Sequence, residues 1–305
     1  MKILSILLAI GWFSVSTEKQ VTFAPGNLQF HSTEGTHSTA VGVDKSGTWR
    51  FAASAWESAT SPWLDAFGWA TSGWDNRAND PDAKLFEPTL NTINNYLASD
   101  INCTGYGPSQ GGGRSQDLTG NSANYDWGIF NAISNGGNEV GKWRTLLYSE
   151  WNYLFYSRKK ADELYGFAYI KTPDSIAGIA ILPDDWSGEA LKEGYSLGEW
   201  QNMEAAGAVF LPEGKYWTAT GNTTNNNKFA QVLFFHEGTN NDPQDLPEER
   251  YNHFPVRLAK DYVDPATGVE TIPQHERTTQ KILCNGQLLM ISGEKIYNTL
   301  GQKVH

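Results

Sequence analysis

The chain has 305 residues, a formal net charge of −11, 39% hydrophobic and 13% aromatic residues, and 12 Trp beside only 3 Met. This length suits one large domain with appendages, or two domains, and the apolar content can bury a sizeable core. The acidic balance argues against a nucleic-acid backbone or an anionic membrane surface as partner. The two cysteines, Cys103 and Cys284, exclude a disulfide framework and any Cys/His zinc motif, and we expect both to be free thiols.

The first residues have the pattern of an export signal. A lysine precedes the apolar run Ile3–Phe13 (ILSILLAIGWF), and Ser14 and Ser16 are small residues suited to a cut after Ser16. The run is too short to span a bilayer stably, and we expect no other transmembrane segment. We therefore predict a signal peptide over residues 1–16 and an extracellular or outer-surface location. The alternative is that Gly11–Ser16 already forms the first strand of the domain.

The next stretch alternates between short strands and loops. QVTFAPGNLQF (Gln20–Phe30) predicts two strands around a Pro25-Gly26-Asn27 turn, and TWRFA (Thr48–Ala52) predicts another. Ser61–Asp80 carries its aromatic rings without any period, which predicts an aromatic loop. Asn102–Asn124 is rich in Gly, Ser, Asn and Gln and is predicted to be the most mobile internal loop. Its GGGR run lacks the flanking strand and helix that a phosphate-binding loop needs.

A first helix is predicted around Tyr148–Ser157. Trp151, Leu154 and Phe155 recur there at the i, i+3, i+4 spacing that places side chains on one helical face. These three residues should form one buried stripe.

A second helix is predicted to begin after Ser196. Ser196 and Glu199 match the S-x-x-E capping box, and Gly207 is a natural residue to end the helix. Trp200 and Met203 would supply its apolar face.

Strands are predicted between and after these helices, and Phe229–Phe235 carries apolar residues on both faces, as a central strand does. Short strands with two helices indicate an α+β fold. The predicted strands are Phe167–Lys171, Ile176–Leu182, Ala208–Leu211, Tyr216–Ala219, Lys228–Phe235 and Phe254–Ala259.

Several aromatic blocks of this stretch resemble the Fibrobacter succinogenes major paralogous domain, which is common in exported proteins of gut Bacteroidetes. The matching blocks occur in the family's order across Gln20–Asp261: Trp143-Arg144 before Glu150-Trp151, Leu182–Trp186 (LPDDW), Tyr216-Trp217, and Val256–Leu258. That family is distantly similar to the formylglycine-generating, sulfatase-modifying enzymes. The resemblance therefore implies a C-type-lectin-like α+β domain with two short helices, many short strands and long loops.

The chain departs from that family in ways that bear on function. Leu147 stands where relatives carry a Thr or Ser helix cap, so the start of the first helix is weaker by about 1 kcal/mol. The short step from Pro212 to Tyr216 leaves no room for the longer hairpin that relatives often insert. Formylglycine-generating enzymes act through paired cysteines near the active site. No Cys lies between Cys103 and Cys284 in this chain, so those cysteines have no counterparts here. We therefore predict that the protein is not an enzyme.

The end of the chain is predicted to be separate from the main domain, which we assign to residues 17–263. Residues 264–279 have a linker's polar composition, and residues 280–305 predict a small β-tail with Asn285-Gly286 and Ser292-Gly293 turns. Ile296–Val304 (IYNTLGQKV) resembles the C-terminal sorting region of type IX secretion cargo. The alternative is a β-appendage with no sorting role.

Two loops are candidate ligand sites. The Gly/Ser-rich loop Trp63–Trp74 suits glycan stacking, with Trp69 and Trp74 as the first choices, although either ring also suits a core. The acidic loop Asn241–Glu249 offers a second candidate.

In the acidic loop, Asp242, Asp245 and Glu248 supply the oxygen ligands that Ca²⁺ prefers, and C-type-lectin-like folds often hold such sites in long loops. The alternative is a solvated hairpin loop rich in Asn, Asp and Pro. No cofactor other than Ca²⁺ is implied.

Charged residues inside apolar blocks are interpreted as structural. We expect Arg144 and Arg257 to be buried or half-buried and to pair with acidic neighbours. Asp184-Asp185, at the end of a strand, is interpreted in the same way.

The leading hypothesis is an exported, non-catalytic binding or adhesion protein whose ligand is a glycan or an extracellular protein. The alternatives are a degenerate enzyme of the formylglycine-generating type and a structural surface component without a small ligand.

Overall fold

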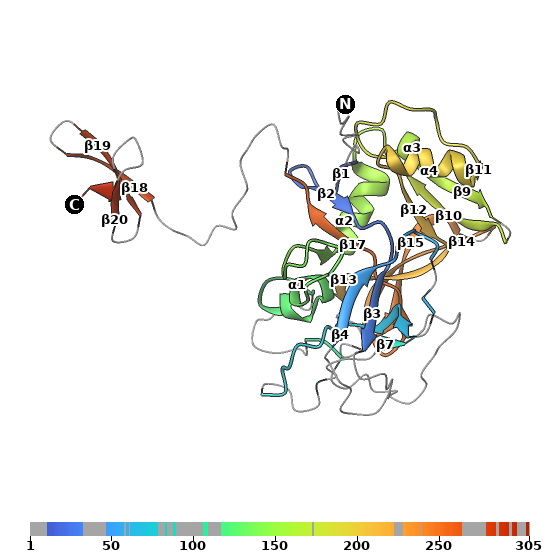
Figure 1. Ribbon diagram of the computed structural model, residues 1–305, viewed down its shortest axis with the longest axis horizontal. Coiled ribbons are helices and arrows are strands. Elements are labelled where there is room, and N and C mark those ends of the chain that lie inside the picture. Colours follow the sequence, from blue (N-terminus) through green and yellow to red (C-terminus); the bar gives the residue numbers. More distant parts are fainter. Residues whose placement is uncertain are drawn as a thin grey trace, which may run out of the picture. The chain divides into compact units, whose positions relative to one another are not determined.

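The computed structural model separates into two compact units, Met1–Tyr262 and Val263–His305 (Figure 1). The apolar run before Gly11, the Gly111–Arg114 run and most of the linker over 264–279 lie outside the described residues. The described residues are 11–32, 47–57, 59–60, 62–78, 83, 88–89, 106–108, 117–172, 174–222, 228–238 and 240–263, with strand residues 279–284, 287–292, 295–297 and 303–304 of the second unit.

The first unit is a mixed α+β fold of mostly short strands and few helices, as the sequence predicts (Figure 1). Among the strands that the structure describes, neighbours are antiparallel except for one parallel pair, β11 with β9. One sheet has the order β1 (Phe13–Ser14), β2 (Gln20–Phe23), β17 (Leu258–Asp261), β8 (Arg144–Thr145). A second has the order β11 (Gly194–Ser196), β9 (Tyr165–Lys171), β10 (Ile176–Ile181), β12 (Val209–Pro212).

Three smaller sheets complete this unit among the described residues. They have the orders β13 (Gly214–Asn222), β14 (Phe229–His236), β15 (Asn240–Glu249); β16 (His253–Phe254), β6 (Ala66–Gly68), β7 (Pro88–Thr89); and β4 (Gly47–Phe51), β3 (Leu28–Ser32), β5 (Trp63–Leu64). The helical segments are η1 (Gly120–Tyr125), α1 (Trp127–Phe130), α2 (Tyr148–Asn152), η2 (Tyr153–Ser157), α3 (Ala161–Leu164) and α4 (Leu197–Ala205).

The first predicted helix is present, but it changes character halfway. Residues 148–152 form α2, and residues 153–157 widen into the π-type turn η2. The predicted stripe is confirmed, because Trp151, Leu154 and Phe155 are each at most 1% exposed. Leu147 precedes α2 and has no side-chain acceptor, while the Glu150 carboxylate accepts from the Leu147 N–H at 2.9 Å. The helix start therefore has half of a capping box.

The second predicted helix is confirmed as α4. The Ser196 hydroxyl accepts from the Glu199 N–H, and the Glu199 carboxylate accepts from the Ser196 N–H, which satisfies two end donors at once. Trp200 is fully buried, and Gly207 follows the helix with a φ of +98°, a left-handed conformation that favours glycine.

The strands on either side of Pro25-Gly26-Asn27 do not pair with each other. β2 pairs with β1 and β17, whereas β3 pairs with β4 and β5. The chain therefore passes from one sheet to another at this turn. A Cβ on Gly26 would lie 2.5 Å from the Ala52 carbonyl oxygen, so only glycine allows this close approach.

The strand predicted over Phe254–Ala259 is divided in two. β16 pairs with β6, and β17 pairs with β2 and β8. Pro255 lacks an N–H and cannot continue a ladder on both sides. Its carbonyl instead accepts from the Trp217 N–H, and that of Val256 from the Leu28 N–H.

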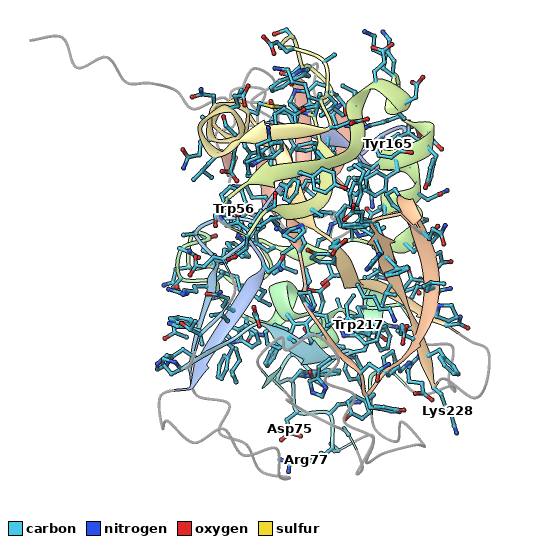
Figure 2. All side chains as sticks on the ribbon, turned by 90° about the vertical axis from the view of Figure 1, so that its right-hand side faces the viewer. Trp56, Asp75, Arg77, Tyr165, Trp217 and Lys228 are labelled. Carbon is cyan, nitrogen blue, oxygen red and sulfur yellow. The ribbon has the colours of Figure 1, made fainter. Side chains whose placement is uncertain are left out.

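The tryptophans mainly build the core. Seven of the 12 are buried, in three apolar clusters that run through the first unit: Trp49, Trp69, Trp127, Trp143, Trp151, Trp200 and Trp217. Figure 2 shows Trp217 inside the domain, where its Nε1 donates to the Phe67 carbonyl at 2.7 Å. β14 lies between β13 and β15, which confirms the predicted central strand.

The segment Gly11–Ser16 is part of this domain, which is the alternative that the sequence leaves open. Phe13 and Val15 are each 1% exposed. The Asp184 carboxylate accepts from the Ser14 N–H at 3.2 Å, and the Asp184 N–H donates to the Trp12 carbonyl at 3.0 Å. A cut after Ser16 would therefore remove β1 together with two core residues.

The second unit contains the predicted β-tail. Its strands form one antiparallel sheet with consecutive neighbours, in the order β18 (Thr279–Cys284), β19 (Gln287–Ser292), β20 (Lys295–Tyr297), β21 (Lys303–Val304).

Candidate functional site

The predicted platform residue Trp69 is not available to a ligand. Its side chain is fully buried, its Nε1 donates to the Thr218 carbonyl at 2.9 Å, and the guanidinium of Arg250 lies 4.3 Å from its ring. The expectation that Trp69 stacks on a sugar is therefore wrong. Its hydrogen bond connects residues far apart in the chain, so the ring serves the core.

Trp74 lies differently. It is half-buried and lines a cavity of about 440 Å³. Phe130, at the end of α1, is a second half-buried ring in the same wall. Gly73 has a φ of +96°, which turns the chain sharply between Ser72 and Trp74. Of the two predicted platform residues, only Trp74 contacts an accessible cavity.

The Trp74 ring is held in a defined orientation. It packs edge-on against Tyr125, with the ring centroids 4.8 Å apart and the planes at 84°. The Tyr125 hydroxyl in turn accepts from the Asn76 amide at 2.5 Å. A ring held in this way loses little conformational entropy when a ligand stacks on it.

Hydrogen-bonding groups adjoin the two rings. Asn131 donates both of its amide hydrogens to the backbone carbonyls of Ser72 and Trp127, at 2.9 and 3.0 Å, which leaves its side-chain oxygen as an acceptor. Asp75 also lines the cavity, and its carboxylate is paired with Arg77, with N–O distances of 3.0 and 2.6 Å. Figure 2 shows Asp75 and Arg77 at the end of the domain away from Tyr165.

The acidic segment predicted to be a loop is mostly the strand β15. β15 is the edge strand of its sheet, so its two prolines, Pro243 and Pro247, do not interrupt a ladder on both sides. This is why a loop-like composition folds as a strand here.

The strand geometry separates the predicted Ca²⁺ ligands. Asp245 and Glu248 pair in unbroken register with Leu233 and Ala230, and an odd spacing along a strand sends them to opposite faces. Glu248 accepts from the Lys215 ammonium at 2.5 Å and from the Asn252 amide at 2.9 Å. The side chain of Asp242 lies outside the described residues, among which no group of three metal-ligating side chains is found. The predicted Ca²⁺ site is therefore not assembled by Asp245 and Glu248.

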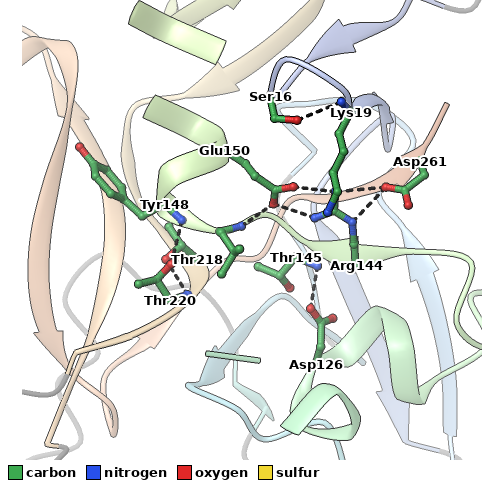
Figure 3. Close-up of polar contacts among 11 residues, drawn as sticks. Ser16, Lys19, Asp126, Arg144, Thr145, Tyr148, Glu150, Thr218, Thr220 and Asp261 are labelled. Atoms are coloured by element: carbon green, nitrogen blue, oxygen red, sulfur yellow. Dashed lines mark hydrogen bonds and ion pairs between the residues drawn. The ribbon is translucent and has the colours of Figure 1, made fainter. Parts of the chain in front are cut away.

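The predicted structural arginines differ in their partners. Arg144 is half-buried and pairs with Glu150 and Asp261, as predicted (Figure 3). Arg257 is 1% exposed, but its hydrogen bonds go to the Ala24 and Phe210 carbonyls and the Asn27 amide oxygen rather than to a carboxylate. Burial lowers the pKa of Arg257 to about 10. The prediction of an acidic partner was wrong for this residue.

Asp184 is structural, as the sequence suggests. It forms an ion pair of 2.8 Å with Arg158, whose side chain is fully buried, and it also holds the backbone on either side of Phe13. Asp126, which the sequence analysis did not single out, is buried at the start of α1, beside Thr145 of β8. Burial raises the pKa of Asp126 to about 6. Its carboxylate nevertheless accepts from the Thr145 N–H at 2.7 Å (Figure 3) and from the Gly128 N–H at 2.9 Å.

Most of the residues that line the Trp74 cavity were not among the predicted site residues. Trp49, Phe130 and Asn131 come from β4 and the end of α1, far from Trp74 in the chain. The signal available was small: Asn131 ends a short helix that follows the Asp126 cap. Only the folded chain brings these residues to Trp74.

Comparison of the chain with protein-family models, with curated proteins and with solved structures found no match. Among the described residues, no helix is long and apolar enough to cross a membrane.

Proposed function

We propose that the chain is an exported, non-catalytic binding protein in which the cavity beside Trp74 takes a carbohydrate, on a domain of the C-type-lectin-like type. The observation that supports this most strongly is that the half-buried Trp74, whose ring packs against Tyr125, lines a cavity of about 440 Å³. A volume of this size falls within the usual range of ligand pockets, which is roughly 300–1,000 Å³.

The chemistry of the wall suits a sugar. A pyranose presents a face of C–H groups that packs against an aromatic ring, and hydroxyls at its edge that need acceptors. Trp74 and Phe130 provide the rings, while Asp75 and the Asn131 side-chain oxygen provide acceptors.

The same wall supports binding rather than hydrolysis. Glycosidases generally need two carboxyl groups that face each other across the bond. Among the described residues that line this cavity, the single carboxylate is that of Asp75, which is already paired with Arg77. The Ser72 hydroxyl donates to the Asn124 carbonyl at 2.6 Å and is not activated by a base in this contact.

A glycan array followed by calorimetry tests the proposal. The Trp74→Ala protein should bind the best glycan at least about tenfold more weakly, which is the loss of roughly 1.4 kcal/mol. Trp63→Ala is the matched control, because Trp63 is also half-buried but its ring is covered by the Arg50 guanidinium at 3.8 Å and lies outside the cavity. The control should bind like the unmodified protein.

Chelation separates this site from the acidic segment. Binding beside Trp74 should survive EDTA, since the wall needs no metal, whereas a Ca²⁺-dependent glycan site would lose its ligand. If no glycan binds and none raises the melting temperature, the structural-component alternative is supported instead.

A further inference from the structure

A second cavity, of about 200 Å³, lies on another part of the domain and shares no lining residue with the Trp74 cavity. Its wall comes from the segment before β1, from β2 and the turn after it, from the end of α4, and from β12. An engineered apolar cavity of about 150 Å³ accepts benzene. This one therefore has room for a small molecule of roughly six to ten heavy atoms.

The buried residue Arg257 lines the cavity. It has five N–H donors, and three of its nitrogens donate to neutral oxygens at 3.0–3.3 Å. Among the described residues it has no carboxylate within ion-pair distance. The cavity is thus bordered by a buried positive charge that retains donors for a ligand.

Thr22, on β2, adds a buried polar group without a partner. Thr22 is 5% exposed and lines the cavity. Its hydroxyl oxygen has no hydrogen-bond partner among the described residues. A buried hydroxyl normally has a partner, and leaving it unsatisfied is costly. A polar ligand in this cavity would supply the missing partner.

Glu204, near the end of α4, provides a negative charge in the same wall. Its carboxylate makes no hydrogen bond or ion pair with any described residue. Burial raises the pKa of Glu204, and the nearby charge of Arg257 opposes this rise. A lone anion would be attracted by Arg257 and repelled by Glu204. A small zwitterion satisfies both groups.

We propose that this cavity binds a small α-amino acid, with the carboxylate of the ligand toward Arg257 and Thr22 and its ammonium toward Glu204. The side chain of the ligand would face Phe23 and Val209, which favours a short aliphatic group. This proposal is independent of the carbohydrate site.

Calorimetry of the full chain with L-alanine and L-valine tests this, with propionate and propylamine as probes that each carry one of the two charges. The amino acids should bind saturably at millimolar concentrations, and each single-charge probe should bind at least about tenfold more weakly. Propionate binding as tightly as alanine would overturn the zwitterion assignment. So would a failure of both amino acids to bind.

Two variants test the assigned residues without disturbing Arg257, whose removal from the core would endanger folding. Glu204→Gln should weaken alanine binding at least about tenfold, and the near-isosteric Thr22→Val at least about threefold. Thr22→Val removes a hydroxyl that has no hydrogen-bond partner among the described residues, so the fold should persist. Glu193→Gln, an exposed change outside the cavity, is the control. Unchanged alanine affinity in both test variants would contradict the proposal, whatever the result for carbohydrate.

Discussion

Arg144 and Glu150 form a two-point ion pair at the start of α2, with Nη1–Oε2 and Nη2–Oε1 distances of 2.7 and 2.8 Å (Figure 3). The same carboxylate accepts from the Leu147 N–H, so one side chain both neutralises the arginine and caps the helix. Asp261, at the end of β17, contacts Arg144 from the other side at 3.1 Å. The pair therefore connects β8, α2 and β17.

Glu150→Ala should lower the free energy of unfolding by about 2–4 kcal/mol, because it leaves a half-buried guanidinium with only an exposed partner and removes a helix cap. Urea denaturation measures this. Glu139→Ala breaks the exposed Lys142–Glu139 pair and should cost less than about 1 kcal/mol. Equal losses in the two variants would show that the Arg144–Glu150 pair contributes no more than a surface pair.

Trp151→Ala should lower the free energy of unfolding by about 3–5 kcal/mol, because it opens a cavity in the core. The ring stacks between Phe23 and Phe155, at centroid distances of 5.2 and 5.8 Å. Chemical denaturation is the measurement, and Tyr156→Ala, an exposed residue of the same segment, is the comparison. A loss below about 1 kcal/mol for Trp151→Ala would mean that the stripe is not packed as described.

A chain that begins at Thr17 should be less stable than one that begins at Gly11. It lacks β1, and the burial of Phe13 and Val15 contributes about 3–6 kcal/mol at 1.5–3 kcal/mol for each side chain. Thermal unfolding of the two proteins checks this. Sequencing the N-terminus of protein from its native source is the companion experiment: a mature end at Thr17 on a fully stable protein would contradict the role assigned to β1.

Asp126 should make stability depend on pH. Burial raises its folded pKa to about 6, so the folded protein holds this proton more tightly than the unfolded chain does. Its contribution to stability is therefore present at low pH and falls as the pH rises from about 4 through about 6, by roughly 1–3 kcal/mol.

Asp126→Asn cannot titrate, so the stability of the unmodified protein relative to this variant should decline across that interval and then level off. Urea denaturation at a series of pH values measures the difference. Asp162→Asn, on an exposed turn of α3, controls for the loss of one charge. A difference that stays constant from pH 4 to pH 7 would contradict the assignment.

Several local elements and the α+β class follow from short stretches of the sequence. Ser196 and Glu199 cap α4 because a capping box needs only four consecutive residues. The spacing of Trp151, Leu154 and Phe155 likewise predicts one apolar face from residues at most four positions apart. Apolar residues on both faces of β14 predicted its central position for a similar reason.

Which rings and charges are accessible depends on contacts between distant parts of the chain. Trp69 and Trp74 lie in one aperiodic segment. Trp69 is buried, where it donates to a carbonyl on β13 and packs against the guanidinium of Arg250. Trp74 instead lines a cavity together with Phe130. Asp245 and Glu248 look like neighbours in the sequence, but an edge strand sends them to opposite faces. Accessibility depends on residues that are distant in the chain, and local composition carries no record of them.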